Sequence, residues 1–459
     1  MAELEKDLTK GNVWKQLVIF AIPVFISNLI QSVYSVADMM IVSRFGGTNS
    51  VSAVSISSGI MLIVINLASG IATGGTVMIG QFLGAGEREK IKESISTLFI
   101  TLAALALVFT GTLFLFINPL LEALNTPPEA YEEAYGYLLV SILGIVFIFG
   151  YNALGGVMRG MGDGNTPLKF VAVACGVNIV LDVVFVKGFQ LGAVGAAAAT
   201  VIAQGVSMVS CVVYLIRNRF IFDFRLSSFR FSGEKFIMLM KVGLPSAVQQ
   251  AATNFSFLVL GAQINSIAGV AASAATGIVS KFNSFALLPE VAVSTSVATM
   301  ISQNMGVGDL KRTRKVTGYG LILCCGISVV IFTFVQLFPH EIFRLFGAEE
   351  NVVQAGVLYM KSFSFEYVCM PFIVALNGVF IGTGNGWVSL ITDTASAFLV
   401  RIPLAIYLGT TAGLGVFGIG CAVPCATFVG AFITFLFYIS GCWKKSTIIR
   451  QGDYQPEVK

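Results

Sequence analysis

Charged residues are scarce in this sequence. Asp, Glu, Lys and Arg together make up 11% of the 459 residues, whereas soluble domains carry roughly 25%. Hydrophobic residues make up 56%, which is more than a single aqueous core can hide. These proportions exclude an ordinary soluble domain and favour a chain whose solvent is the lipid bilayer. The net charge of +4 is small, and we expect no nucleic-acid partner.

Catalytic and metal-binding patterns are also missing. His340 is the only histidine, and the 8 cysteines show no CxxC spacing, which leaves neither a His/Cys metal centre nor an HExxH motif. The glycine-rich turns at 159–164 and 381–386 lack the Lys-Ser/Thr pair of a nucleotide-binding loop. An integral membrane enzyme, one alternative for such a chain, would need a cluster of this kind. We therefore expect no enzyme and no organic cofactor, and an ion gradient as the energy source.

Long apolar runs are abundant instead. A spanning helix needs roughly 20 apolar residues, and by this rule the sequence predicts an all-α integral membrane protein with twelve transmembrane helices. The expected spans lie at 14–41, 51–82, 95–118, 135–158, 167–186, 191–216, 243–266, 272–304, 316–338, 355–381, 387–408 and 413–440.

Lys and Arg are distributed unevenly between the connecting segments. If the N-terminus is cytoplasmic, the cytoplasmic connections hold most of the basic residues, and the outer ones hold only Arg44, Lys187 and Arg344. The outer loop 118–133 is acidic and contains no Lys or Arg. The positive-inside rule therefore predicts a multi-pass protein of the cell membrane with both termini in the cytoplasm.

The second half of the chain repeats the first. The repeat implies a six-span unit used twice, with both copies in the same orientation because six is even. We expect two six-helix lobes related by a pseudo-two-fold axis along the membrane normal. The lobes are an N-lobe (1–216) and a C-lobe (243–441). A basic cytoplasmic linker (217–242) joins them, and a cytoplasmic tail (442–459) follows the C-lobe. The matching positions, 222 or 223 residues apart, are Pro23 and Pro245, Gln81 and Gln303, Gly160 and Gly382, and LGAVG at 191–195 with LGVFG at 414–418.

A row of polar residues lies inside the first expected span. Asn28, Gln31, Ser35 and Asp38 are spaced 3, 4 and 3 residues apart, which places them on one face of a helix. A carboxylate within a spanning helix is costly and commonly belongs to an ion path or a proton relay. We therefore expect the coupling chemistry to depend on Asp38.

A second acid lies in the fifth expected span. Asn178 and Asp182 are four residues apart and share one helix face. The carboxylates of Asp38 and Asp182 would repel each other in a low-dielectric pocket, which favours a proton or a cation between them. Alternatively, each acid is a structural hydrogen-bonding residue. Neutral oxygens for a Na+ site would come from Asn152, Tyr137 and Thr200, while the C-lobe positions that correspond to the acids and Asn178 hold Leu260, Ala405 and Arg401.

In this order the motifs resemble the multidrug and toxin extrusion (MATE) family along nearly the whole chain. The matching segments include VADMMIVSRFG around Asp38, GQFLGAGE after the second span, MRGMGDGNTP after the fourth, and NIVLDVVFVKGFQLGAVGAAAAT over the fifth and into the sixth. The resemblance implies a twelve-helix, two-lobed exporter that exchanges Na+ or H+ for organic, often cationic, compounds. It also implies a central cavity that opens to one side at a time.

Within that family the chain is similar to the DinF-like and archaeal-like members, which carry an acid in the first span and an Asn-x-x-x-Asp pair in the fifth. Asp38, Asn178 and Asp182 stand at those positions. NorM-type members add an acid in the seventh span, where this chain has Gln250 and Asn254 and no carboxylate. The resemblance therefore favours ion coupling through the N-lobe.

The expected function is secondary active export of multiple drugs by alternating access, with small organic molecules and membrane lipid as partners and a monomeric protein. A lipid-linked precursor flippase of the same superfamily and a channel are the alternatives, and the sequence leaves the substrate and the choice between Na+ and H+ open. Glu366 in the tenth span is either a substrate contact or a residue that packs near an interface. The expected substrate-binding residues are Gln31, Tyr34, Gln250, Asn254 and Glu366.

Overall fold

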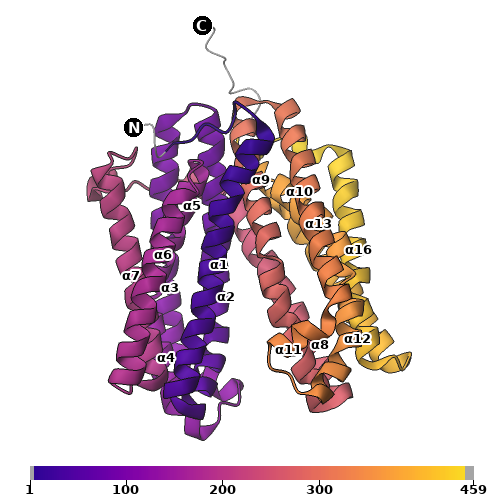
Figure 1. Ribbon diagram of the computed structural model, residues 1–459. Helices are drawn as coiled ribbons and strands as arrows, with labels where there is room; N and C mark the ends of the chain where they lie inside the picture. The colour runs from indigo at the N-terminus through magenta and orange to yellow at the C-terminus, as the bar shows by residue number, and fades with distance from the viewer. Residues whose placement is uncertain (1–4, 450–459) are drawn as a thin grey trace. The chain divides into compact units, whose positions relative to one another are not determined.

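Nearly the whole described chain is helical. The computed structural model describes residues 5–449, without the side chains of Ala268 and Val270, and this part contains no strand (Figure 1). Residues 1–4 of the expected N-lobe and 450–459 of the expected tail lie outside the described residues. The predicted all-α class is therefore confirmed.

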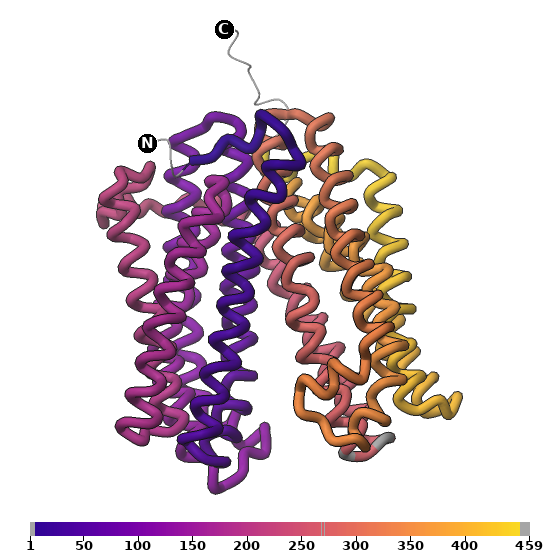
Figure 2. The backbone as a smooth tube through the Cα atoms, in the orientation of Figure 1, coloured from indigo at the N-terminus to yellow at the C-terminus, as the bar shows by residue number. Residues whose placement is uncertain are grey.

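The helices of the N-terminal half are α1 (Val13–Phe45), α2 (Gly47–Gly84), α3 (Arg88–Ala123), α4 (Pro128–Leu143), α5 (Ile145–Gly160), α6 (Asn165–Asp182), η1 (Val183–Gly188), α7 (Gly192–Arg217) and η2 (Leu226–Ser228). Those of the C-terminal half are α8 (Gly233–Ala286), α9 (Leu288–Val307), α10 (Leu310–Leu337), α11 (Pro339–Leu345), α12 (Glu350–Phe363), α13 (Glu366–Gly382), α14 (Gly386–Ala395), η3 (Ser396–Arg401), α15 (Ile402–Ile406), η4 (Tyr407–Thr411), α16 (Gly415–Ser440) and η5 (Cys442–Lys444). Their paths can be followed in Figure 2.

Eleven of the twelve expected spans coincide with apolar helices of spanning length. In the described chain, nine helices are long and apolar enough to cross a membrane, and two helix pairs, α4 with α5 and α12 with α13, add one span each if a bend of 48° is allowed. The remaining expected span, 243–266, lies within α8. That helix breaks at Gly269 (φ +70°, ψ −174°), in a backbone region that glycine alone occupies readily.

The chain forms two compact units. The first contains Ile26–Ala247 together with residues 5–7, and the second contains Leu8–Phe25 and the chain from Val248 onward. The beginning of α1, up to Phe25, therefore belongs to the second unit. The beginning of α8, up to Ala247, belongs to the first unit. The expected lobes, 1–216 and 243–441, differ from these units in this exchange.

Glycines explain how the beginning of α8 fits into the first unit. A Cβ atom on Gly70 of α2 would lie 2.6 Å from the backbone of Ala247, and one on Gly74 would lie 2.6 Å from the carbonyl oxygen of Leu239. In the second unit, Leu17, Phe20 and other apolar residues of the beginning of α1 are buried in a core that α9, α10 and α13 share.

The sequence repeat is also a repeat of packing within each unit. On α5, a Cβ atom on Gly156 would lie 2.7 Å from the carbonyl oxygen of Ala72 of α2. On α13, a Cβ atom on Gly378 would lie 2.7 Å from the carbonyl oxygen of Ser294 of α9. Each pair of positions is 222 residues from its counterpart, so both lobes use the same direct helix-to-helix contact. Small residues allow such backbone contact in membrane helices.

One π-helical turn of each half follows the repeat, whereas η3 has no counterpart in the N-terminal half. The turn η1 continues α6 directly after Asp182, and η4 lies at the corresponding place near the end of the eleventh span. π-Helical turns are rare and are frequent at functional sites. In the N-terminal half, this turn therefore marks the region of the expected coupling residues.

We predict that alanine at Gly156 or Gly378 lowers the thermal stability of the detergent-solubilised protein. The added methyl group would clash with a backbone carbonyl oxygen that no rotamer change can remove, at a cost of about 1–3 kcal/mol. Matched controls are Gly111→Ala on α3 and Gly318→Ala on α10, where no atom lies within 4 Å of the added carbon. These should leave stability unchanged or raise it slightly. Equal melting temperatures for all four variants would contradict the close contact.

Candidate ion-coupling site

The expected coupling residues come from five helices of the first unit. α1 carries Gln31, Tyr34 and Asp38 at helical spacing on its carboxyl-terminal part, and Asp38 is half-buried. Asp182 is the last residue of α6 and is fully buried. The neutral candidates lie on α4, α5 and α7. The structure therefore brings together residues as far apart in the sequence as Asp38 and Thr200, which are 162 positions apart (200 − 38).

Asp38 and Asp182 form a carboxyl pair. Their side chains interact electrostatically. Oδ1 of Asp38 and both carboxyl oxygens of Asp182 are buried and have no hydrogen-bond partner. Buried oxygens without donors are costly. The geometry therefore favours a proton or a small cation at this position.

Amide and hydroxyl groups surround the pair. Asn178 donates a hydrogen bond from Nδ2 to Oγ1 of Thr200 (3.3 Å), and its own Oδ1 is buried and unpartnered. Tyr137 is buried and interacts electrostatically with both acids. These groups supply the neutral oxygens that a Na+ ion would need beside the carboxyl groups. No group of three or more His, Cys, Asp or Glu side chains that could hold a metal ion occurs in residues 5–449.

Asn152 is engaged differently from the other expected ligands. Its Nδ2 donates to the carbonyl oxygen of Ile148, one turn earlier in α5 (2.8 Å). The amide is therefore anchored to its own helix. This contact follows from the local i−4 geometry of a polar side chain in an apolar helix, where no water is available to the donor.

Two members of the cluster, Gln204 and Tyr151, were not among the residues expected from the sequence. Gln204 lies one turn after Thr200 on α7 and interacts with Tyr34, and its Oε1 is buried without a partner. Tyr151 interacts with Gln31. The signal for Gln204 was its i+4 spacing from Thr200, and for Tyr151 its position beside Asn152.

The second unit has buried charges in a different arrangement. Asp393 of α14 accepts hydrogen bonds from Gln249 and from Nδ2 of Asn377 (3.1 Å). The guanidinium of Arg401 lies over the Phe257 ring at 4.7 Å, and its Nε and Nη1 are buried without partners. The arginine interacts electrostatically with Asp393 and with Glu366. The duplicated helices thus carry a carboxyl pair in one lobe and an arginine with separate acids in the other.

The expected substrate residues lie in both units. Gln31 and Tyr34 belong to the first unit, and Tyr34 interacts electrostatically with both acids of the carboxyl pair. Asn254 is exposed on α8, and Gln250 lies one turn before it. Glu366 is buried at the start of α13, accepts a hydrogen bond from Oγ1 of Thr427 (3.3 Å), and has an unpartnered Oε2.

Comparisons with known proteins show the family and the fold of this chain. The family model MatE matches residues 23–184 and again 245–407. The chain belongs to the MatE family. The two matches begin at Pro23 and Pro245, the first pair of positions in the repeat. MatE proteins are multi-pass membrane transporters, so the expected class of protein is confirmed.

Relatives of this MatE protein match it over nearly its whole length. The probable multidrug resistance protein YpnP of Bacillus subtilis is 29% identical over 438 residues, which is 95% of this chain and 97% of that protein. The probable multidrug resistance protein NorM of Thermotoga maritima is 26% identical over 95% of this chain and 94% of its own. A solved multidrug resistance MATE family transporter has a TM-score of 0.90 at 24% identity, over 95% of this chain and 98% of that one. The twelve-span, two-lobed fold is thereby confirmed.

We predict that Asp182→Asn raises the thermal stability of this MatE protein in sodium-free buffer at pH 8. The amide removes a buried charge that lacks donors and can itself donate to Asp38, which we expect to stabilise the fold by about 1–3 kcal/mol. Unfolding can be followed by the melting temperature in detergent.

The matched control is Asp163→Asn, a buried carboxylate of the same unit. Asp163 accepts hydrogen bonds from the backbone N–H groups of Asn165 (2.9 Å) and Thr166 (3.2 Å) and from the Thr166 hydroxyl. Replacing this fully partnered carboxylate should lower stability. If both variants lower the melting temperature equally, the carboxyl pair has no unsatisfied oxygens.

Proposed function

We propose that this MatE protein is a secondary active exporter of multiple organic, often cationic, compounds. The site that couples export to an ion gradient is the pair Asp38 and Asp182 in the first unit. The observation that supports this most strongly is the set of buried oxygens without donors, which belong to the two acids, Asn178 and Gln204. Buried acceptor oxygens that lack donors favour a proton or a cation among them.

The ion is H+ or Na+, and no organic cofactor takes part. A proton would occupy one carboxyl group and form the hydrogen bond between Asp38 and Asp182. A Na+ ion would lie among the carboxyl oxygens and the neutral oxygens of Asn178 and Thr200. Either ion neutralises part of the buried negative charge, so the occupied and empty sites favour different conformations of α1 and α6.

Export follows if the ion and the substrate favour different conformations of the transporter. Outward-facing, the carboxyl pair takes up the ion from outside, and the resulting change of shape releases the substrate there. Inward-facing, the pair releases the ion, and the site is free to bind the next substrate. We place the protein in the cell membrane as a monomer. Both termini lie in the cytoplasm in this proposal, because the basic residues concentrate in the connections on that side.

The substrate class rests on the relatives and on the side chains of both units. YpnP and NorM are described as probable multidrug resistance proteins. Organic cations bind to aromatic faces and buried carboxylates. The residues that we propose to contact substrate are Gln31, Tyr34, Gln250, Asn254 and Glu366.

We predict that Asp38→Asn and Asp182→Asn each abolish ion-driven efflux of a fluorescent organic cation from proteoliposomes. An Asn side chain can neither take up a proton nor neutralise a cation, so the imposed ion gradient can no longer drive efflux. A Na+ gradient and a pH gradient should be imposed separately. Wild-type transport under only one of them identifies the coupling ion.

The matched control is Asp309→Asn, at the start of α10 in the second unit. The Asp309 carboxylate caps this helix by accepting a hydrogen bond from the backbone N–H of Arg312 (2.8 Å), and Asn caps helices equally well. This variant should transport at the wild-type rate. Undiminished efflux by either N-lobe variant would rule out the carboxyl pair as the coupling site. No transport by the wild type under either gradient would favour the lipid-linked precursor flippase.

A further inference from the structure

A small pocket lined by charged and apolar residues lies in the first unit, away from the carboxyl pair. Three segments that are distant in sequence meet there: Glu5 near the N-terminus, the first turns of α3, and the segment 218–221 that follows α7. The pocket has a volume of about 240 Å³. We propose that it binds the phosphate-bearing headgroup of an anionic phospholipid at the membrane surface.

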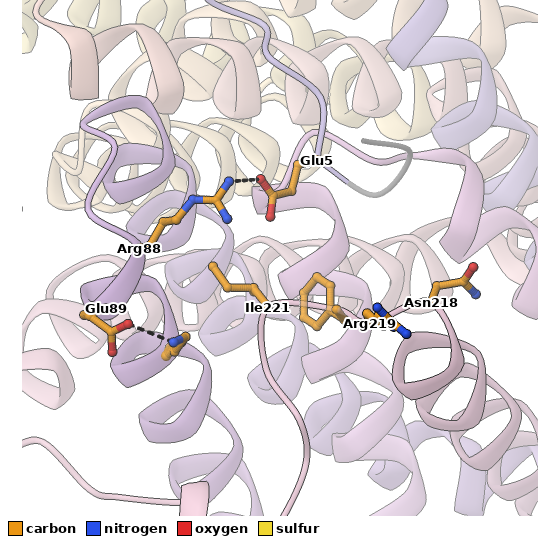
Figure 3. Close-up of a pocket in the computed structure, with 8 residues that line it drawn as sticks. Glu5, Arg88, Glu89, Asn218, Arg219 and Ile221 are labelled. Atoms are coloured by element: carbon orange, nitrogen blue, oxygen red, sulfur yellow. Dashed lines mark hydrogen bonds and ion pairs between the residues drawn. The ribbon is translucent and has the colours of Figure 1, made fainter. Parts of the chain in front are cut away.

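The charges around the pocket are arranged so that an anion can compete for them. Arg88 Nη2 pairs with Glu5 Oε2 at 3.0 Å, and Lys92 Nζ pairs with Glu89 Oε1 at 2.8 Å. Exposed pairs of this kind contribute little to stability, so a phosphate can replace either carboxylate. Figure 3 shows the Arg88–Glu5 pair and Arg219 around the same pocket.

Three basic residues line the pocket: Arg88, Lys92 and Arg219. Of these, Arg219 has no ion-pair partner within the described residues. Its backbone is held in the left-handed region (φ +52°) at the end of α7. Its N–H donates to the carbonyl oxygen of Ile216 (3.1 Å), and the next N–H, of Phe220, donates to that of Leu215 (3.0 Å). The helix end thus fixes the Arg219 backbone beside the pocket without any ligand, which reduces the entropy cost of binding one.

Arg219 belongs to the segment 218–231. This segment is attached to α3, and some of its apolar side chains are exposed. The Ser96 hydroxyl donates to the carbonyl oxygen of Arg230 (2.8 Å) and accepts from its N–H (2.6 Å), and the Phe229 ring packs edge-on against Phe99. By contrast, the Leu226 and Phe231 side chains are 92% and 56% exposed. Exposed apolar residues among arginines are typical of segments that lie in the interface of an anionic membrane. This combination favours a phospholipid over a soluble phosphate compound.

Arg225 provides a matched control on the same segment. It does not line the pocket, and its charge is already engaged by Asp223, with Nε 3.6 Å from Oδ2. The hydrogen bond from the Ser228 hydroxyl and that from the Arg225 backbone N–H hold the pKa of Asp223 below its usual value. Neutralising Arg225 therefore changes the net charge of the segment without changing the proposed site.

The test is a titration of the full-length detergent-solubilised protein, read by native mass spectrometry. The probes are dioctanoyl phosphatidylglycerol, dioctanoyl phosphatidylcholine and inorganic phosphate. We expect the wild type to bind phosphatidylglycerol more tightly than the other two. Arg219→Gln should weaken this binding about fivefold, which is the contribution of one basic residue near an anionic headgroup. Arg225→Gln should leave it unchanged.

Glu5→Gln provides a test in the opposite direction. It releases Arg88 from its carboxylate, so we expect tighter binding of phosphatidylglycerol, a gain that misfolding cannot produce. If Arg219→Gln does not fold, as judged by its melting temperature, Lys92→Gln replaces it. Equal losses in Arg219→Gln and Arg225→Gln, or equal affinity for the two lipids, would overturn the proposal. Inorganic phosphate bound as tightly as phosphatidylglycerol would show a soluble anion site instead. All of these readouts are independent of the coupling ion.

Discussion

Direct contact between helix backbones underlies the architecture of both lobes. In a bilayer the lipid tails are as apolar as the side chains, so helices gain little by burying leucines against one another. Close contact and dispersion must hold them together instead. At Gly156 and Gly378 the absence of a side chain lets one helix rest on a carbonyl oxygen of its neighbour. The same contact at equivalent positions gives the two lobes a common frame.

This common frame carries different chemistry in its two copies. The N-lobe places two carboxyl groups together and surrounds them with oxygens that lack donors, whereas the C-lobe places an arginine at the position of Asn178. Buried groups without partners lower stability and are retained in proteins mainly where function requires them. Both lobes contain such groups, but the carboxyl pair occurs in the N-lobe, where we propose that it holds the ion. In the same proposal, Glu366 of the C-lobe contacts the substrate.

The first unit contains two charged sites whose surroundings differ, the carboxyl pair and the pocket near Arg219. The carboxyl pair lies in a region of low dielectric, where a single proton or ion changes the balance of energies strongly. The pocket near Arg219 is exposed, and its ion pairs are weak and exchangeable. The sequence thus places two acids together at the buried site and ion-paired acids and bases around the exposed pocket.

Much of this could be predicted from the sequence because the relevant signals are local or repeated. The lengths of apolar runs predict the spans, the offset of 222 residues predicts two lobes, and helical spacing places Asp38 and Asp182 on polar faces. Only the tertiary structure decided which distant residues meet. It brought Gln204 and Tyr151 into the cluster, directed the Asn152 amide to its own helix, and moved the beginnings of α1 and α8 into opposite units. Such outcomes depend on how helix backbones pack across long sequence separations, and no local pattern of residues records that packing.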